Sequence, residues 1–142
     1  MRFMMLLKAD RDTEAGVPPT EQDLATMANY NEQMAQAGVL LDGAGLQPSS
    51  KGARIRLEGG TPRVIDGPFA ETKELIAGYW MIEVGSKEEA IEWALRCPWH
   101  MLPGEGRAPE IELRQMFELD DFEQGEAVEH HRRIMEAIEK PV

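Results

Sequence analysis

The chain has 142 residues, enough for about one domain, and 42% hydrophobic with 29% charged residues is typical of a globular protein. Its 26 acidic residues outnumber the 15 basic ones, and the net charge of −11 disfavours a nucleic-acid backbone or an anionic membrane as partner. No apolar run approaches the roughly 20 residues of a membrane-spanning helix. The apolar run before Lys8 is too short for a signal peptide, and the single Cys97 cannot form an intrachain disulfide. We therefore expect a cytoplasmic protein.

The N-terminal part predicts a strand followed by a helix. Residues 2–8 are apolar on both faces, which indicates a buried strand. Thr20 and Asp23 form a capping pattern after two prolines, and apolar residues then recur at helical spacing as far as Gly38. We expect a helix over about residues 20–37.

The middle of the chain predicts a short strand and a hairpin. Val39, Leu40 and Leu41 begin a strand that ends near Gly43. Residues 53–58 alternate between apolar and charged side chains, as in a half-buried strand. Gly59-Gly60 and then residues 63–65 follow at once, which is typical of a hairpin with a two-residue turn.

A strand, a helix and a last strand complete this part of the chain. Residues 75–84 are again apolar on both faces. Ser86 and Glu89 form a capping box that begins a second helix, and Pro98 closes it. Residues 111–117 alternate as in a strand.

Without the hairpin, the element order is βαββαβ, the order of the ferredoxin-like α+β fold with two helices on one face of an antiparallel sheet. Residues 2–8 and 75–84 are apolar on both faces, so the face of the sheet opposite the two helices must be covered as well. A second copy is the simplest cover, and we expect a homodimer with an α/β barrel between the subunits. Residues 1–118 would form this domain.

Residues 119–142 form an acidic tail that predicts an amphipathic helix. The apolar stripe of that helix contains Ala127, His131, Ile134, Met135 and Ile138.

The familiar signatures of phosphate-binding loops, dinucleotide-binding folds, zinc sites and serine hydrolases are missing from the sequence. His130 and His131 are neighbours on the predicted helix, so their side chains diverge and cannot chelate one ion together. We therefore expect neither a metal nor a cofactor.

The segment from Asp66 to Glu74 joins two predicted strands and reads DGPFAETKE. An aspartate can bond its own backbone, a proline fixes the exit of the turn, and Gly67 is expected to adopt a positive φ. With Gly78-Tyr79, Glu89-Ala90 and Trp93, the segment resembles the YCII-related (DGPF-domain) family. The N-terminal strand, the residues 45–48 and the residues 111–114 match as well, so the resemblance covers about residues 1–118. Cys97-Pro98 and Asp121-Phe122 are similar to the longer bacterial members.

This resemblance implies a dimeric ferredoxin-like α/β barrel and little about activity, because the family is largely uncharacterised. A few small members are thought to be enzymes, one of them in chloroaromatic breakdown. Longer members are often encoded beside extracytoplasmic-function sigma factors. Small members carry a histidine on the first helix, proposed to pair with a carboxylate, whereas residues 20–37 of this chain contain none.

Asp66 and His100 are the catalytic candidates, because an Asp–His pair can perform acid–base chemistry near neutral pH if both side chains reach one cleft. In the alternative interpretation, backbone N–H groups of its own turn hold the Asp66 carboxylate, and His100 is a surface loop residue. The candidates for ligand binding are Asp42, Arg54, Arg56, Phe69 and Lys73. The two arginines suit a carboxylate ligand, or they form a solvated face.

Two functions remain open at this point. One is a homodimer with an apolar-walled cleft between the sheet and the loop at Asp66, which binds a small organic molecule and performs cofactor-free acid–base or lyase-type chemistry. The other is a non-enzymatic regulatory or adaptor protein linked to a sigma factor, whose acidic tail engages a basic surface. A subunit with a role only in assembly is a third interpretation.

Overall fold

The computed structural model describes residues 1–70, 74–106 and 108–139. Its main sheet is antiparallel with the strand order β2-β5-β1-β6. This order is compatible with the ferredoxin-like arrangement expected from the sequence. The strands are β1 (Arg2–Lys8), β2 (Leu40–Gly45), β5 (Ile76–Glu83) and β6 (Ile111–Gln115).

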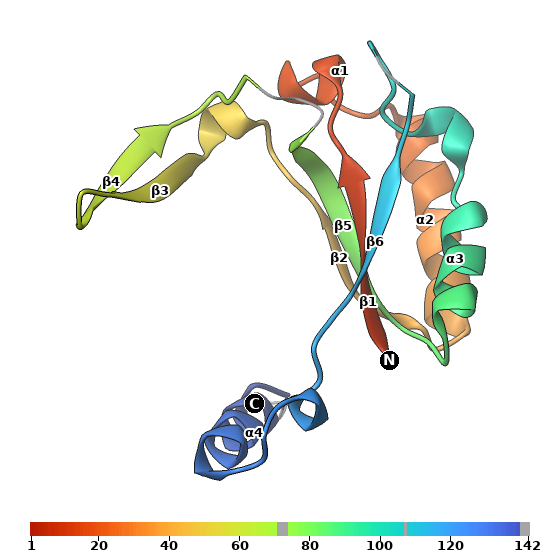
Figure 1. Ribbon diagram of the computed structural model, residues 1–142. Helices are drawn as coiled ribbons and strands as arrows, with labels where there is room; N and C mark the ends of the chain where they lie inside the picture. Colours follow the sequence, from red (N-terminus) through yellow and green to blue (C-terminus); the bar gives the residue numbers. More distant parts are fainter. Residues whose placement is uncertain (71–73, 107, 140–142) are drawn as a thin grey trace.

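Two helices, α2 and α3, cover one face of this sheet, and the other face is open (Figure 1). The Thr20 side chain accepts a hydrogen bond from the N–H of Asp23 at the start of α2, and Gly38 follows the helix at φ 75°. Ser86 caps α3 in the same way. The helices of the described residues are α1 (Arg11–Glu14), α2 (Glu21–Gln36), α3 (Lys87–Leu95) and α4 (Glu126–Glu139). Short 3₁₀ turns are η1 (Ser49–Lys51), η3 (Trp99–Met101) and η4 (Leu119–Asp121).

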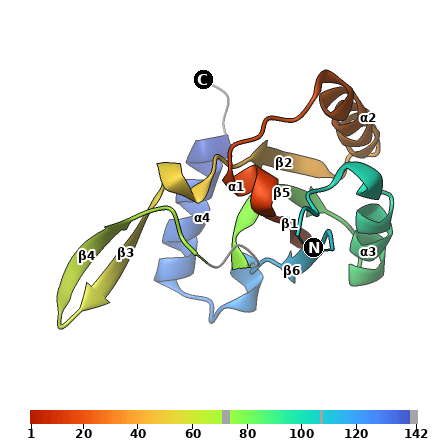
Figure 2. The same ribbon diagram turned by 90° about the horizontal axis from the view of Figure 1, so that it is seen from above.

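The predicted hairpin is present as a separate two-stranded sheet, β3 (Ala53–Glu58) and β4 (Thr61–Asp66). Gly59 and Gly60 turn the chain with φ 55° and 83°, values that a two-residue hairpin turn needs and that other residues rarely adopt. The hairpin extends away from the main sheet on its open side, and α4 lies on that side as well (Figures 1 and 2).

The core lies between the sheet and helices α2 and α3. Met5, Met34 and Ile82 are fully buried there. The Tyr30 hydroxyl donates a hydrogen bond of 2.6 Å to the main-chain carbonyl of Trp93, which ties α2 to α3. Burial also raises the pKa of that phenol. Core packing and a buried hydrogen bond therefore fix both helices on the sheet.

The structure differs from the sequence prediction at short elements. Helix α1 is absent from the prediction because it has only four residues. The last strand, β6, ends at Gln115, two residues earlier than expected, and the tail helix α4 follows it. None of the helices in the described residues is long and apolar enough to span a bilayer.

Candidate functional site

A cleft of about 850 Å³ lies at the end of the main sheet near α1. Leu7, Gly45 and Ala77 contribute its floor from β1, β2 and β5. One side is formed by residues 16–19 and the first turns of α2, and the other by residues 101–105. The volume lies in the range of pockets that hold small molecules.

The cleft has apolar walls and acidic side chains. Every titratable side chain among the described residues that line it is a carboxylate: Asp10, Asp12, Asp23 and Glu105. The apolar lining includes Leu7, Val17, Leu24, Met27, Leu46 and Leu102. Such a site favours a ligand with an apolar body and a positive charge over an anion of the same shape.

Asp10 positions the loop at one side of the cleft. It is 4% exposed, and its two carboxylate oxygens accept hydrogen bonds of 2.8 Å from the N–H groups of Thr13 and Glu105. Burial raises the pKa of the Asp10 carboxyl, but these backbone hydrogen bonds outweigh it, and the net pKa is lowered. Asp10 is therefore charged at neutral pH and suits positioning rather than proton transfer.

The other carboxylates of the cleft have fewer internal partners. Asp23 accepts a hydrogen bond of 3.1 Å from the N–H of Thr20. Glu105 lies 4.0 Å from the exposed guanidinium of Arg11. The exposed Asp12 carboxylate has no hydrogen bond or ion pair with any described residue. The Asp12 carboxylate is therefore available to form an ion pair with a cationic ligand.

The loop that follows β4 is connected to α1 through Ser49. The N–H of Phe69 donates a hydrogen bond of 3.0 Å to the Ser49 hydroxyl, which in turn donates to the carboxylate of Glu14. The N–H of Ser49 donates to the same carboxylate at 3.1 Å. These contacts connect the loop to the short helix beside the cleft.

Gly67 corrects one expectation, because it is not among the described glycines with positive φ. Its peptide bond with Pro68 is cis, and a Cβ atom at this position would overlap the main-chain carbonyl of Ser49. The N–H of Gly67 also donates a hydrogen bond of 3.0 Å to the carbonyl of Gly52. Close backbone approach, rather than a positive φ, requires glycine here.

Neither predicted catalytic residue lines the cleft. Asp66 is the exposed last residue of β4, and its carboxylate accepts no hydrogen bond from the described residues, so the predicted turn arrangement is not found within the described part of the loop. His100 is exposed in η3, although the next residue, Met101, does line the cleft. The acid–base role of this pair stays a prediction.

The predicted ligand-binding residues lie on the hairpin side and on the open face of the sheet. The Arg54 guanidinium stacks on the Phe69 ring at 3.9 Å, and Arg56 lies 3.8 Å from Glu58. Asp42 accepts a hydrogen bond of 3.2 Å from the Tyr79 hydroxyl, and its charge raises the pKa of that phenol. Lys73 lies outside the described residues.

The prediction missed the carboxylates of the cleft. The sequence Asp10-Arg11-Asp12-Thr13 contains a usable signal, because an aspartate three residues before a threonine predicts a reciprocal helix cap, as observed.

Cys97 is buried at the end of α3, and burial raises its pKa to about 12, so the thiol is unreactive. The described residues contain no group of three or more His, Cys, Asp or Glu side chains placed to hold a metal ion.

Comparison with known proteins gives two findings. A model of the YCII-related domain matches residues 1–111. The chain is also 35% identical over 74 residues to a protein named Uncharacterized protein R00369 from Rhizobium meliloti (strain 1021). That match covers 52% of this chain and 60% of the relative, so the chain spans about three fifths of the relative's length.

Proposed function

This chain belongs to the YCII-related family, and from the cleft at the end of its sheet we propose that it binds a small organic molecule there. The observation that carries the proposal is the combination of a volume of about 850 Å³ with apolar walls and carboxylates. A cleft of this kind holds the apolar part of a ligand away from water and leaves polar groups to orient it.

The ligand that fits best is an organic cation, such as a protonated amine on an apolar skeleton. Asp12 offers an exposed carboxylate without a described partner, and Asp23 and Glu105 add negative charge to the same cleft. An anion would meet like charge on entering, whereas a cation gains attraction and keeps its apolar part against the walls.

Acid–base or lyase-type chemistry would need a proton donor or acceptor near this ligand. His100 directly precedes the cleft residue Met101, so its imidazole is the candidate for this role. Asp10 does not suit the task because its pKa is lowered. Binding is therefore the primary proposal, and catalysis by His100 with Asp66 is its extension.

A homodimer is the second part of the proposal. Phe3 and Met5 of β1 are buried beneath the helices, so Met4 and Leu6 point to the open face of the sheet. Met4 lies opposite Met81, and Leu6 lies opposite Tyr79. These four side chains give the open face an apolar centre that a second copy would cover.

The cleft proposal is tested by thermal melts with three ligands that share one skeleton: hexylammonium, hexanol and hexanoate. We expect hexylammonium to raise Tm most and hexanoate least. Asp12→Asn should reduce the effect of hexylammonium, and Glu88→Gln, an exposed carboxylate on α3, should not. Equal shifts for the cation and the anion, or no shift with any of the three, would contradict the proposal.

A second candidate function is that of a non-enzymatic adaptor, associated with an extracytoplasmic-function sigma factor. It is favoured by the exposure of Ile134, Met135 and Ile138, which are 44%, 41% and 69% accessible on an acidic segment. In this alternative, α4 engages a basic and apolar surface of another protein.

A further inference from the structure

The hairpin carries an uncovered apolar face. Ile55 lies opposite Val64, and Leu57 lies opposite Pro62, so these side chains share one face. Ile55, Leu57 and Val64 are 69%, 70% and 69% exposed. A two-stranded hairpin is at best marginally stable in water, so this face is expected to pack against another surface.

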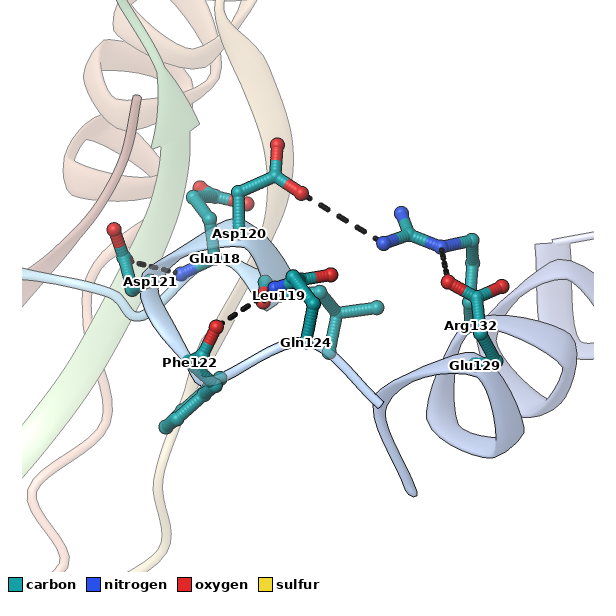
Figure 3. A network of polar contacts seen from close by, with 8 residues as sticks. All are labelled: Glu118, Leu119, Asp120, Asp121, Phe122, Gln124, Glu129 and Arg132. Atoms are coloured by element: carbon teal, nitrogen blue, oxygen red, sulfur yellow. Dashed lines mark hydrogen bonds and ion pairs between the residues drawn. The ribbon is translucent and has the colours of Figure 1, made fainter. Parts of the chain in front are cut away.

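Helix α4 carries a second uncovered apolar surface, formed by Ile134, Met135 and Ile138. The helix is held in its outward position by polar contacts around η4, shown in Figure 3. Gln124 donates hydrogen bonds to the carbonyls of Leu119 and Phe122 at 3.0 and 2.7 Å. Arg132 pairs with Asp120 at 3.7 Å and with Glu129 at 3.5 Å.

The base of the tail is anchored to the sheet as well. Arg2 of β1 pairs with Glu118 at 3.1 Å and donates a hydrogen bond to the carbonyl of Phe117 at 3.2 Å. The rings of Phe117 and Phe122 lie 5.0 Å apart. The connection between β6 and α4 therefore has defined contacts, and they hold α4 on the open side of the sheet (Figure 1).

The hairpin and helix α4 are similar in length and opposite in charge, but their exposed apolar side chains do not cover each other within one chain. Strands of six residues span about 20 Å, and a helix of 14 residues spans about 21 Å. Residues 51–66 contain four basic and two acidic residues, whereas residues 118–139 contain eight acidic and two basic ones. The hairpin lies near one end of the sheet and α4 near the other (Figure 1).

We propose that each hairpin packs its apolar face, formed by Ile55, Leu57 and Val64, on the apolar side of α4 in a second copy of the chain. The inference rests on the proposed homodimer and names the surfaces that hold it together. Twofold symmetry repeats the contact, so both hairpins and both copies of α4 are covered in one closed dimer. The opposite charges of the two segments favour this pairing and oppose contact between two acidic tails.

A second copy fits better than a foreign protein because the chain itself supplies the complementary surface. Residues 51–66 are net basic within a chain whose net charge is −11, and residues 118–139, the segment that includes the helix they would meet, are net acidic. A foreign partner of α4 would leave the apolar face of the hairpin uncovered.

The test is sedimentation equilibrium of the full chain with single substitutions on each surface. Leu57→Ser and Ile138→Ser should each raise the dimer dissociation constant about tenfold or more, because each removes a large side chain from the contact. Leu95→Ser is the matched control: Leu95 is 67% exposed, but it lies on α3, away from both surfaces. The double variant should weaken the dimer by less than the product of the single effects, because both substitutions disrupt the same contact.

A cross-linking experiment tests the pairing independently of stability. Copies with Leu57→Cys are mixed with copies with Ile138→Cys and oxidised, and we expect covalent heterodimers, whereas Leu95→Cys with Ile138→Cys should give few. A wild-type dimer that none of the serine variants weakens would overturn this inference and leave the homodimer intact. A wild-type chain that is monomeric at micromolar concentration would overturn both the homodimer and this inference, and it would leave ligand binding in the cleft untouched.

Discussion

Replacement of Gly67 by alanine tests how the loop after β4 is packed. The added Cβ would overlap the carbonyl oxygen of Ser49, which is main chain and cannot move aside by a change of rotamer. The backbone at Gly67 or at η1 must shift, and this movement would strain the hydrogen bonds between Gly67 and Gly52 and between Phe69 and Ser49. Overpacking of this kind costs about 2 kcal/mol, with more where backbone has to move.

Thermal melts of three alanine variants separate the causes. For a chain of this length, about 2 kcal/mol corresponds to a fall in Tm of roughly 6 °C for Gly67→Ala. Gly38→Ala meets no atom within 4 Å but has φ 75°, so it should cost about 1 kcal/mol. Gly45→Ala has neither problem and should leave Tm unchanged or slightly higher.

If Gly67→Ala melts at the same temperature as Gly45→Ala, the close approach to Ser49 does not exist in solution, and our explanation of this loop is wrong. If Gly67→Ala and Gly38→Ala lose the same small amount of stability, backbone conformation rather than steric overlap would be the better explanation.

Two further predictions concern buried polar groups. Tyr30→Phe removes the donor to the Trp93 carbonyl and should lower the free energy of unfolding by about 1–3 kcal/mol, measured by urea denaturation. Asp10→Asn should cost about 1–2 kcal/mol at pH 7, because the amide nitrogen cannot accept the backbone N–H groups that the carboxylate now binds. The folded pKa of Asp10 lies below its ordinary value of 3.8, so this stability is present above about pH 4 and is lost as the pH falls through the folded pKa. The difference in stability between wild type and Asp10→Asn should therefore narrow on acidification, and a difference that widened would contradict the sign of the pKa shift.

The regular elements could be predicted from the sequence because their signals are local and agree with one another. The capping pattern of Thr20 and Asp23 predicted the start of α2, and Gly59-Gly60 predicted the hairpin turn. Ser86 likewise predicted the start of α3. Each signal depends on side-chain and backbone geometry within four residues, so a single sequence contains it.

The cleft could not be predicted in the same way, because it is formed by segments far apart in the chain. Asp10 and Glu105 meet through a hydrogen bond across 95 positions, and no local pattern reports such a contact. The requirement for glycine at position 67 likewise comes from the Ser49 carbonyl, not from the turn itself. Turn chemistry therefore predicted the correct glycine for the wrong physical reason.

The most direct test of the account is a heteronuclear NMR titration of the labelled protein with hexylammonium, with hexanoate as the comparison. If the cleft binds an organic cation, hexylammonium shifts the amide signals of residues that line the cleft, among them Thr13, Gly16, Leu46 and Gly104, and hexanoate leaves them in place. Shifts confined to Asp66 and the hairpin, no shift of the cleft amides with hexylammonium, or equal shifts with both compounds would contradict binding of a cation in the cleft.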